Sequence, residues 1–135
     1  MNDFDVPFVD WDELVAFVRS HWTLEAVDEQ GEWFERVWQW AERSQQVTVA
    51  RVEYGGDTWV SWAAAIADDA AMTDAQLIEA TAGEVGRIIR DDGCCWLEQH
   101  IPLELLNPRL FERYSDSFAK RADDLEREIT GGDRD

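Results

Sequence analysis

The residues best suited to covalent chemistry lie close together near position 100. Cys94, Glu98 and His100 alternate along one predicted strand, so they share a face, and a cysteine beside a histidine could serve as a nucleophile. Cys94 and His100 are six residues apart, however, which is about 20 Å at roughly 3.3 Å per residue, so they cannot meet within one chain. We therefore predict that this pair is not catalytic.

Other signatures of an enzyme are missing from the sequence. It has no GxSxG motif, no glycine-rich phosphate-binding loop and no HExxH motif. The other histidine, His21, falls at the end of a predicted helix, where a cation interacts favourably with the helix dipole. The sequence therefore predicts a protein without enzymatic activity and without a cofactor.

Metal binding is not predicted either. With only two histidines and the adjacent pair Cys94 and Cys95, the chain lacks the ligands of a zinc site, and adjacent cysteines rarely form a disulfide. The acidic pairs do not have the alternating spacing of a calcium loop: Asp68-Asp69, Asp91-Asp92 and Asp123-Asp124. We expect a reduced, cytoplasmic protein without a metal.

The charge of the chain excludes two classes of partner. Its 135 residues include 30 Asp and Glu against 12 Lys and Arg, which gives a net charge of -18, and each half of the chain carries about half of it. Nucleic acids and anionic membranes would be repelled. The start, MNDFDVPFVD, lacks the basic and apolar regions of a signal peptide, and no apolar run is long enough to span a membrane.

The apolar periodicity predicts one domain over 1–135, with an N-terminal arm over 1–9. Asp10 and Glu13 form an acidic capping box before the first helix, and Asn107 with Pro108 opens a long last helix that ends at Gly131. Glycine-containing turns at 55–57 and 91–93 indicate hairpins. The predicted order is αβββαββα, with strands over 32–42, 46–54, 58–67, 85–90 and 94–103, and a second helix over 73–83.

Tryptophan is the compositional anomaly, with eight residues in the chain. A period of two places Trp33 opposite Trp38 and Trp40, and Trp59 opposite Trp62. A sheet with helices on one side buries only one face, so some rings are expected on the surface or under another chain. The alternative is that the arm and the long helix cover the second face. The predicted client-binding residues are Trp11, Phe17, Trp22, Trp33, Trp38, Trp40, Trp59 and Trp62.

Several segments, taken in order, resemble the type III secretion chaperone-like superfamily, that is, the Tir-chaperone (CesT-like) and YbjN-like proteins. They are RSQQVTVARV, WVSWAAAIAD, VGRIIRDDGCCWLEQHIPLELL and the closing RADDLEREITGGD. The resemblance implies an α+β fold with a curved antiparallel sheet packed by helices. It also implies a homodimer without enzymatic activity that binds an extended segment of a client protein. The density of tryptophan departs from dedicated secretion chaperones, and the arginine-rich composition with the closing GGDRD looks more like the YbjN-like branch.

The resemblance also suggests where two copies would meet. The predicted dimer surface combines the second helix with the last hairpin and comprises Leu77, Ile78, Ile88, Trp96 and Leu97. A different function stays open beside the chaperone-like one. The chain could be an acidic inhibitor or immunity-type protein that neutralises a basic partner, in which case binding would depend steeply on salt.

Overall fold

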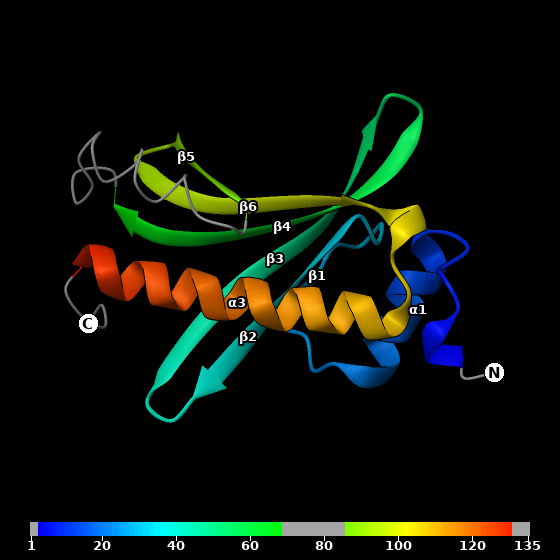
Figure 1. Cartoon of the computed structure of the whole chain (residues 1–135), viewed down its shortest axis with the longest axis horizontal. Coiled ribbons are helices and arrows are strands. Elements are labelled where there is room, and N and C mark those ends of the chain that lie inside the picture. Colours follow the sequence, from blue (N-terminus) through cyan, green and yellow to red (C-terminus); the bar gives the residue numbers. More distant parts are fainter. Residues whose placement is uncertain (1–2, 69–85, 131–135) are drawn as a thin grey trace.

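The computed structural model describes residues 3–68 and 86–130 (Figure 1). The helix predicted over 73–83, with Leu77 and Ile78, lies outside the described residues. The described elements follow in the order η1 (Asp3–Asp5), α1 (Trp11–His21), β1 (Ala26–Val27), β2 (Trp33–Trp40), β3 (Arg43–Tyr54), β4 (Asp57–Asp68), β5 (Arg87–Asp91), β6 (Cys94–Pro102), η3 (Leu103–Leu105) and α3 (Pro108–Thr130).

The strands form one twisted antiparallel sheet of six strands in the order β1-β2-β3-β4-β6-β5 (Figure 1). The predicted meander β2-β3-β4 and the hairpin β5-β6 are both confirmed, and β6 returns to pair with β4. The β5-β6 turn needs positive φ at Asp92 and Gly93, with values of 53° and 76°, as tight hairpin turns do. The short strand β1 was not predicted, because two residues are too few to show a period.

Local signals in the sequence start both helices where they were expected. The Asp10 carboxylate accepts the backbone N–H of Glu13 at 2.9 Å, and the Asn107 side chain accepts the backbone N–H of Leu110 at 2.8 Å. These contacts satisfy donors that have no partner within the helix. Both helices pack on the same side of the sheet, with α3 running across the central strands (Figure 1).

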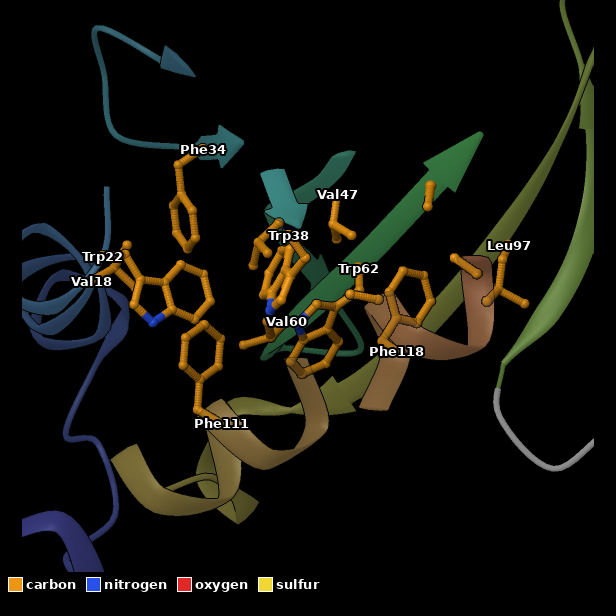
Figure 2. Close-up of a cluster of buried hydrophobic side chains, with 14 of the residues drawn as sticks. Val18, Trp22, Phe34, Trp38, Val47, Val60, Trp62, Leu97, Phe111 and Phe118 are labelled. Atoms are coloured by element: carbon orange, nitrogen blue, oxygen red, sulfur yellow. The ribbon is translucent and has the colours of Figure 1, made fainter. Parts of the chain in front are cut away.

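The core lies between the two helices and this side of the sheet (Figure 2). Aromatic rings make up much of it: the Trp22 ring stacks on Phe111 with centroids 5.2 Å apart and meets Trp38 edge-on at 5.5 Å. Trp62 lies beside Phe111 at 5.9 Å. The remaining large side chains of the core include Phe34, Phe118, Leu14, Ile66, Leu97, Leu106 and Leu125.

The indole N–H groups of the three central tryptophans donate to consecutive positions on one side of α3. Trp22 donates to Glu112 Oε1 at 3.2 Å, Trp62 to Ser115 Oγ at 2.9 Å, and Trp38 to Asp116 Oδ1 at 2.8 Å. Ser115 and Asp116 follow Glu112 by three and four residues. Residues at this spacing lie on the same side of a helix. A single helix therefore provides the acceptors that allow three indoles to be buried.

The side chain of Arg36 packs against two of these tryptophans. The Arg36 guanidinium lies over the rings of Trp22 and Trp38, at 4.6 Å and 4.2 Å from their centroids. Burial lowers the pKa of Arg36, although Asp116 and Glu112 act in the opposite direction. The group therefore bridges aromatic rings of β2 and the end of α1 to the acidic side of α3.

The N-terminal arm packs on the helices rather than on the sheet. Phe8 contacts Phe17 of α1 and Phe111 of α3 at centroid distances of 5.9 Å and 6.1 Å. The Arg109 guanidinium binds the Asp5 carboxylate at 2.8 Å. The arm therefore adds to the covered side of the sheet and does not reach the other side.

Candidate functional site

The histidines and cysteines considered for catalysis are each engaged in local contacts. The His21 ring stacks on Phe17 at 4.3 Å and its Nδ1 lies 2.9 Å from the Phe17 carbonyl oxygen. His100 Nε2 is 3.4 Å from a Glu98 carboxylate oxygen, and Cys94 Sγ is 3.3 Å from the carbonyl of Ala67. Over residues 3–68 and 86–130, no three His, Cys, Asp or Glu side chains gather in a way that could hold a metal ion.

Four of the eight predicted client-binding residues lie in the interior of the protein, which corrects the surface position expected for them. Trp11, Trp22, Trp38 and Trp62 are 4%, 8%, 6% and 0% exposed. Trp11 donates its N–H to the carbonyl of Gly31 at 2.6 Å, and the other three donate to α3. The indole N–H of each of these four tryptophans has an acceptor inside the fold, so none of the four leaves an unsatisfied donor when it is buried within one chain.

Phe17 and Trp40 are partly buried and also belong to the helix side of the structure. Phe17 is covered by the arm through Phe4 and Phe8. Trp40 packs against the core, and the Lys120 ammonium lies 6.0 Å from its ring centroid. These two rings support the packing of the helices and the arm on the sheet.

The other side of the sheet carries the remaining tryptophans. We call this side, which faces away from α1 and α3, the open face. Because Trp62 points into the core, alternation along β4 directs Trp59 to the open face. The strand register places Trp33 and Trp96 on the same face, and all three rings are partly exposed.

The register also shows what lies between these rings. One row across the sheet reads Trp33, Ala50, Ser61 and His100. A second row reads Ala65, Trp96 and Ile89. Small side chains thus occupy the middle strand β4, and larger side chains flank them. Cross-strand neighbours at this spacing are in contact, so the row forms a continuous surface.

The predicted dimer surface divides between the two faces. Ile88 and Leu97 point to the helix side and are 6% and 1% exposed, so the prediction that they lie on the surface is wrong. Adjacent residues of a strand point in opposite directions, and their neighbours Ile89 and Trp96 therefore lie on the open face. Leu77 and Ile78 are outside the described residues.

Two carboxylates lie on the open face among these rings. Glu35 accepts hydrogen bonds from Gln46 at 2.7 Å and from Thr48 at 3.5 Å. Glu98 lies 3.7 Å from the Arg87 guanidinium, a side chain that is 68% exposed, and it also contacts His100. Both carboxylates therefore have local partners, and neither is isolated.

A cavity of about 670 Å³ opens on this face where β5 begins. Its lining comes from β3, β4, β5 and β6 and comprises Val52, Tyr54, Trp59, Gly86, Arg87, Glu98, Gln99 and His100. Gly86 has a φ of 69°, and a Cβ at this position would clash with the carbonyl oxygen of Glu98. The pairing of β5 with β6 ends next to this close approach, at Arg87 and Glu98. Sequence reasoning assigned neither Val52 nor Tyr54 to a site.

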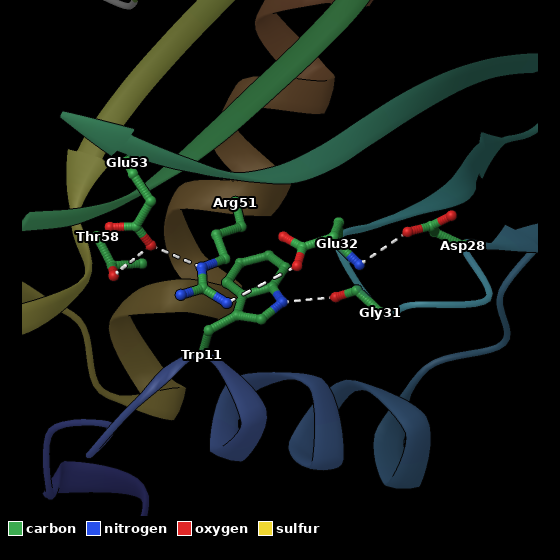
Figure 3. A network of polar contacts seen from close by, with 7 residues as sticks. All are labelled: Trp11, Asp28, Gly31, Glu32, Arg51, Glu53 and Thr58. Carbon is green, nitrogen blue, oxygen red and sulfur yellow. Dashed lines mark hydrogen bonds and ion pairs between the residues drawn. The ribbon is translucent and has the colours of Figure 1, made fainter.

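A second polar cluster lies beside the start of α1 (Figure 3). Arg51 donates to Glu53 at 2.7 Å and lies 3.8 Å from Glu32, while Thr58 donates to Glu53 at 2.9 Å. The hydrogen bond with Glu53 raises the pKa of Arg51, and the same bond lowers the pKa of Glu53. A cavity of about 290 Å³ adjoins Arg51 and Trp11. The Arg51 guanidinium is already paired within this cluster. The cluster therefore links β3 to β4 and to the loop before β2.

Comparison with known proteins supports the fold. No protein-family model matches the chain, and no curated protein matches it either. In the described part of the chain no helix is both long and apolar enough to cross a membrane. A chain of the crystal structure of the ExsC-ExsE complex is similar in structure, with a TM-score of 0.61 and 14% identity over 87% of this chain and 94% of that chain. This likeness confirms the α+β fold, an antiparallel sheet packed by helices, that the sequence resemblance implied.

Proposed function

We propose that this protein is a non-enzymatic, chaperone-like binding module that holds an extended segment of a client protein on its open face. The observation that carries the proposal is the position of Trp33, Trp59 and Trp96. All three lie partly exposed on the one side of the sheet that neither α1 nor α3 covers. Large exposed aromatic surfaces on globular proteins commonly mark interaction sites.

The structural neighbour supports a binding role in general terms. Its crystal structure is that of a complex, formed by ExsC and ExsE. A shared fold does not by itself fix a shared function. The argument for this chain therefore rests on its own open face.

The charge of the chain restricts the client. At a net charge of -18, an acidic segment would be repelled during its approach. The open face itself offers apolar rings with the carboxylates Glu35 and Glu98 between them. We therefore expect a client segment with apolar side chains at alternate positions and a neutral or basic overall charge.

The sheet offers a main-chain contact as well. Strand β5 pairs with β6 only as far as Glu98, so among the described residues 99–102 pair with β4 alone. An exposed strand edge presents unpaired N–H and C=O groups, to which an extended segment can add as a further strand. This edge adjoins the cavity that contains Trp59.

The test is a selection from a phage-displayed library of random 12-residue peptides on the purified protein. Peptides enriched on the wild type are expected to lose at least about tenfold in affinity for a variant in which Trp33, Trp59 and Trp96 are replaced by alanine. The matched control replaces three exposed apolar residues elsewhere, Val9, Leu105 and Tyr114, by alanine, and should bind like the wild type. Equal loss in both variants, or no enrichment, would refute the proposal.

Salt separates this function from the acidic-inhibitor alternative. Apolar capture of a segment should have nearly the same affinity at low and high salt, because its main contribution is the burial of apolar surface. Neutralisation of a basic partner should weaken steeply as salt rises, with the loss mostly in the association rate. A steep loss for the selected peptides would favour the inhibitor function.

Two further expectations belong to the same proposal. We propose that the protein acts in the reducing cytoplasm, because adjacent cysteines such as Cys94 and Cys95 rarely form a disulfide with each other. We also propose a homodimer, although of the residues expected at its surface only Trp96 is partly exposed within the described ranges. Sedimentation analysis of the wild type and of Trp96→Ala tests it: a monomeric wild type would refute the dimer.

A further inference from the structure

Trp59 differs from the other buried indole donors of the protein. The N–H groups of Trp22, Trp38 and Trp62 each reach an acceptor on α3, and that of Trp11 reaches a backbone carbonyl. The N–H of Trp59 is shielded from solvent and has no acceptor within residues 3–68 and 86–130. Buried donors in folded proteins are nearly always hydrogen-bonded, so an exception calls for an explanation.

The surroundings of this N–H suggest what it is for. Trp59 lines the cavity of about 670 Å³ on the open face. Tyr54, which is 75% exposed, contributes a second aromatic ring to the lining. The cavity therefore combines apolar walls with an indole donor that lacks an acceptor within the described residues, and ligand sites commonly combine apolar walls with a few polar groups.

We propose that this cavity anchors the client segment: one apolar side chain packs against Trp59 and Tyr54, and a main-chain carbonyl of the same segment accepts the Trp59 N–H. The inference rests on the proposed function and specifies where and how the segment is held. It assigns Trp59 a polar role that Trp33 and Trp96 do not share.

A neutral acceptor fits the cavity better than an anion. The Arg87 guanidinium in the lining already lies 3.7 Å from the Glu98 carboxylate, and the chain carries a net charge of -18, so a ligand carboxylate would gain little here. A carbonyl of a peptide carries no charge. Within the described residues, 99–102 of β6 pair with β4 alone, and this edge adjoins the cavity. An extended segment that adds there brings main-chain carbonyls to this place. A second copy of the chain would bring another -18.

The binding experiment uses one synthetic 12-residue peptide selected on the wild type. Trp59→Phe keeps an aromatic wall but removes the donor, and we expect roughly tenfold weaker binding, the size of one hydrogen bond to a buried donor. Trp40→Phe, on the helix side of the sheet, removes an indole N–H away from the cavity. It is the matched control and should change affinity less than about twofold. Saturation of the wild type with the peptide should also shift the Trp59 indole N–H resonance downfield.

A stability measurement tests the unpaired donor without any peptide. In urea unfolding, Trp59→Phe should leave the midpoint unchanged or raise it, whereas Trp62→Phe, which leaves the Ser115 hydroxyl without its donor, should lower it. A midpoint lowered equally in both variants would show that Trp59 already has an internal acceptor and would overturn the inference.

The other outcomes are equally decisive. Peptides that bind Trp59→Phe as tightly as the wild type, but not the triple alanine variant, would overturn the anchor while the proposed function stands. If the wild type sediments as a dimer and the Trp59→Phe variant as a monomer, a second copy of the chain occupies the cavity. That result would also overturn the inference.

Discussion

The indole of Trp62 donates its N–H to the Ser115 hydroxyl at 2.9 Å, at a point where both side chains are 0% exposed. Ser115 in turn donates to the carbonyl oxygen of Phe111, one helical turn earlier, at 2.7 Å. A single hydroxyl thus connects β4 to the main chain of α3. This contact lets the largest residue of the sheet lie beneath the helix without an unsatisfied polar atom.

Ser115→Ala should destabilise the protein by about 1 to 3 kcal/mol, because the Trp62 N–H would stay buried without an acceptor. Urea unfolding followed by tryptophan fluorescence measures the change. Ser117→Ala, on an exposed position of the same helix, is the control and should change the free energy of unfolding by less than about 0.5 kcal/mol. Equal effects of the two substitutions would contradict the assigned role of Ser115.

The ion pair between Arg43 and Asp123 should behave as a buried pair. Asp123 is only 2% exposed, and it binds Arg43 at the turn between β2 and β3. Arg43→Met should cost roughly 3 to 5 kcal/mol, since it leaves a buried carboxylate without its cation. The double variant Arg43→Met with Asp123→Leu should recover most of that loss in thermal or chemical unfolding. A double variant as unstable as the single one would show that the charges themselves stabilise the fold.

Gly86 should be less tolerant of substitution than Gly93. Both have positive φ, 69° and 76°, but a Cβ at Gly93 meets nothing within 4 Å, whereas one at Gly86 clashes with the Glu98 carbonyl. Gly93→Ala should therefore cost about 1 to 2 kcal/mol, the penalty of the left-handed backbone alone. Gly86→Ala should cost more and should speed amide hydrogen exchange in β5. Similar losses at the two positions would mean that the clash is relieved freely.

The pKa of Asp124 lies below its ordinary value of 3.8, chiefly because Lys120 donates a hydrogen bond to its carboxylate. A carboxyl whose pKa is lowered by folding adds stability above its unfolded pKa and loses that contribution as the pH falls through the folded value. Lys120→Met should therefore raise the Asp124 pKa toward 3.8 in a carboxyl NMR titration. Arg113→Met, on an earlier turn, should leave it unchanged; an unaltered Asp124 pKa in Lys120→Met would contradict the assignment.

Much of the fold was predictable because its signals are local. Asp10 and Asn107 cap their helices, because each side chain accepts the backbone N–H of the residue three positions later. Glycine-containing turns define the hairpins. The period of two correctly separated Trp33 from Trp38, and Trp59 from Trp62. Such patterns depend only on neighbouring residues, so the sequence displays them directly.

The burial of the rings could not be predicted in the same way. Alternation shows that Trp38 and Trp62 lie on a face but not which face the helices cover. Nor does it show that Glu112, Ser115 and Asp116 would supply acceptors, because polar residues on an amphipathic helix usually face solvent. The interior therefore holds more indoles than apolar patterning alone would allow.

The expected dimer surface failed for a simpler reason. The resemblance placed both Trp96 and Leu97 on this surface, although adjacent residues of a strand point to opposite faces. Alternation along β6 separates Trp96 from Leu97 in the sequence alone. Only the register between β4 and β6 places Trp96 on the same face as Trp59.

The three indole contacts with α3 also fix the helix along its own axis. Sliding α3 by even one residue would move all three acceptors out of reach at once, since each donor is held by a different strand or helix end. The helix and the sheet therefore cannot shear past one another by small steps. Adaptation during capture would therefore have to come from the peptide and from side chains of the open face, while α3 keeps its position on the sheet.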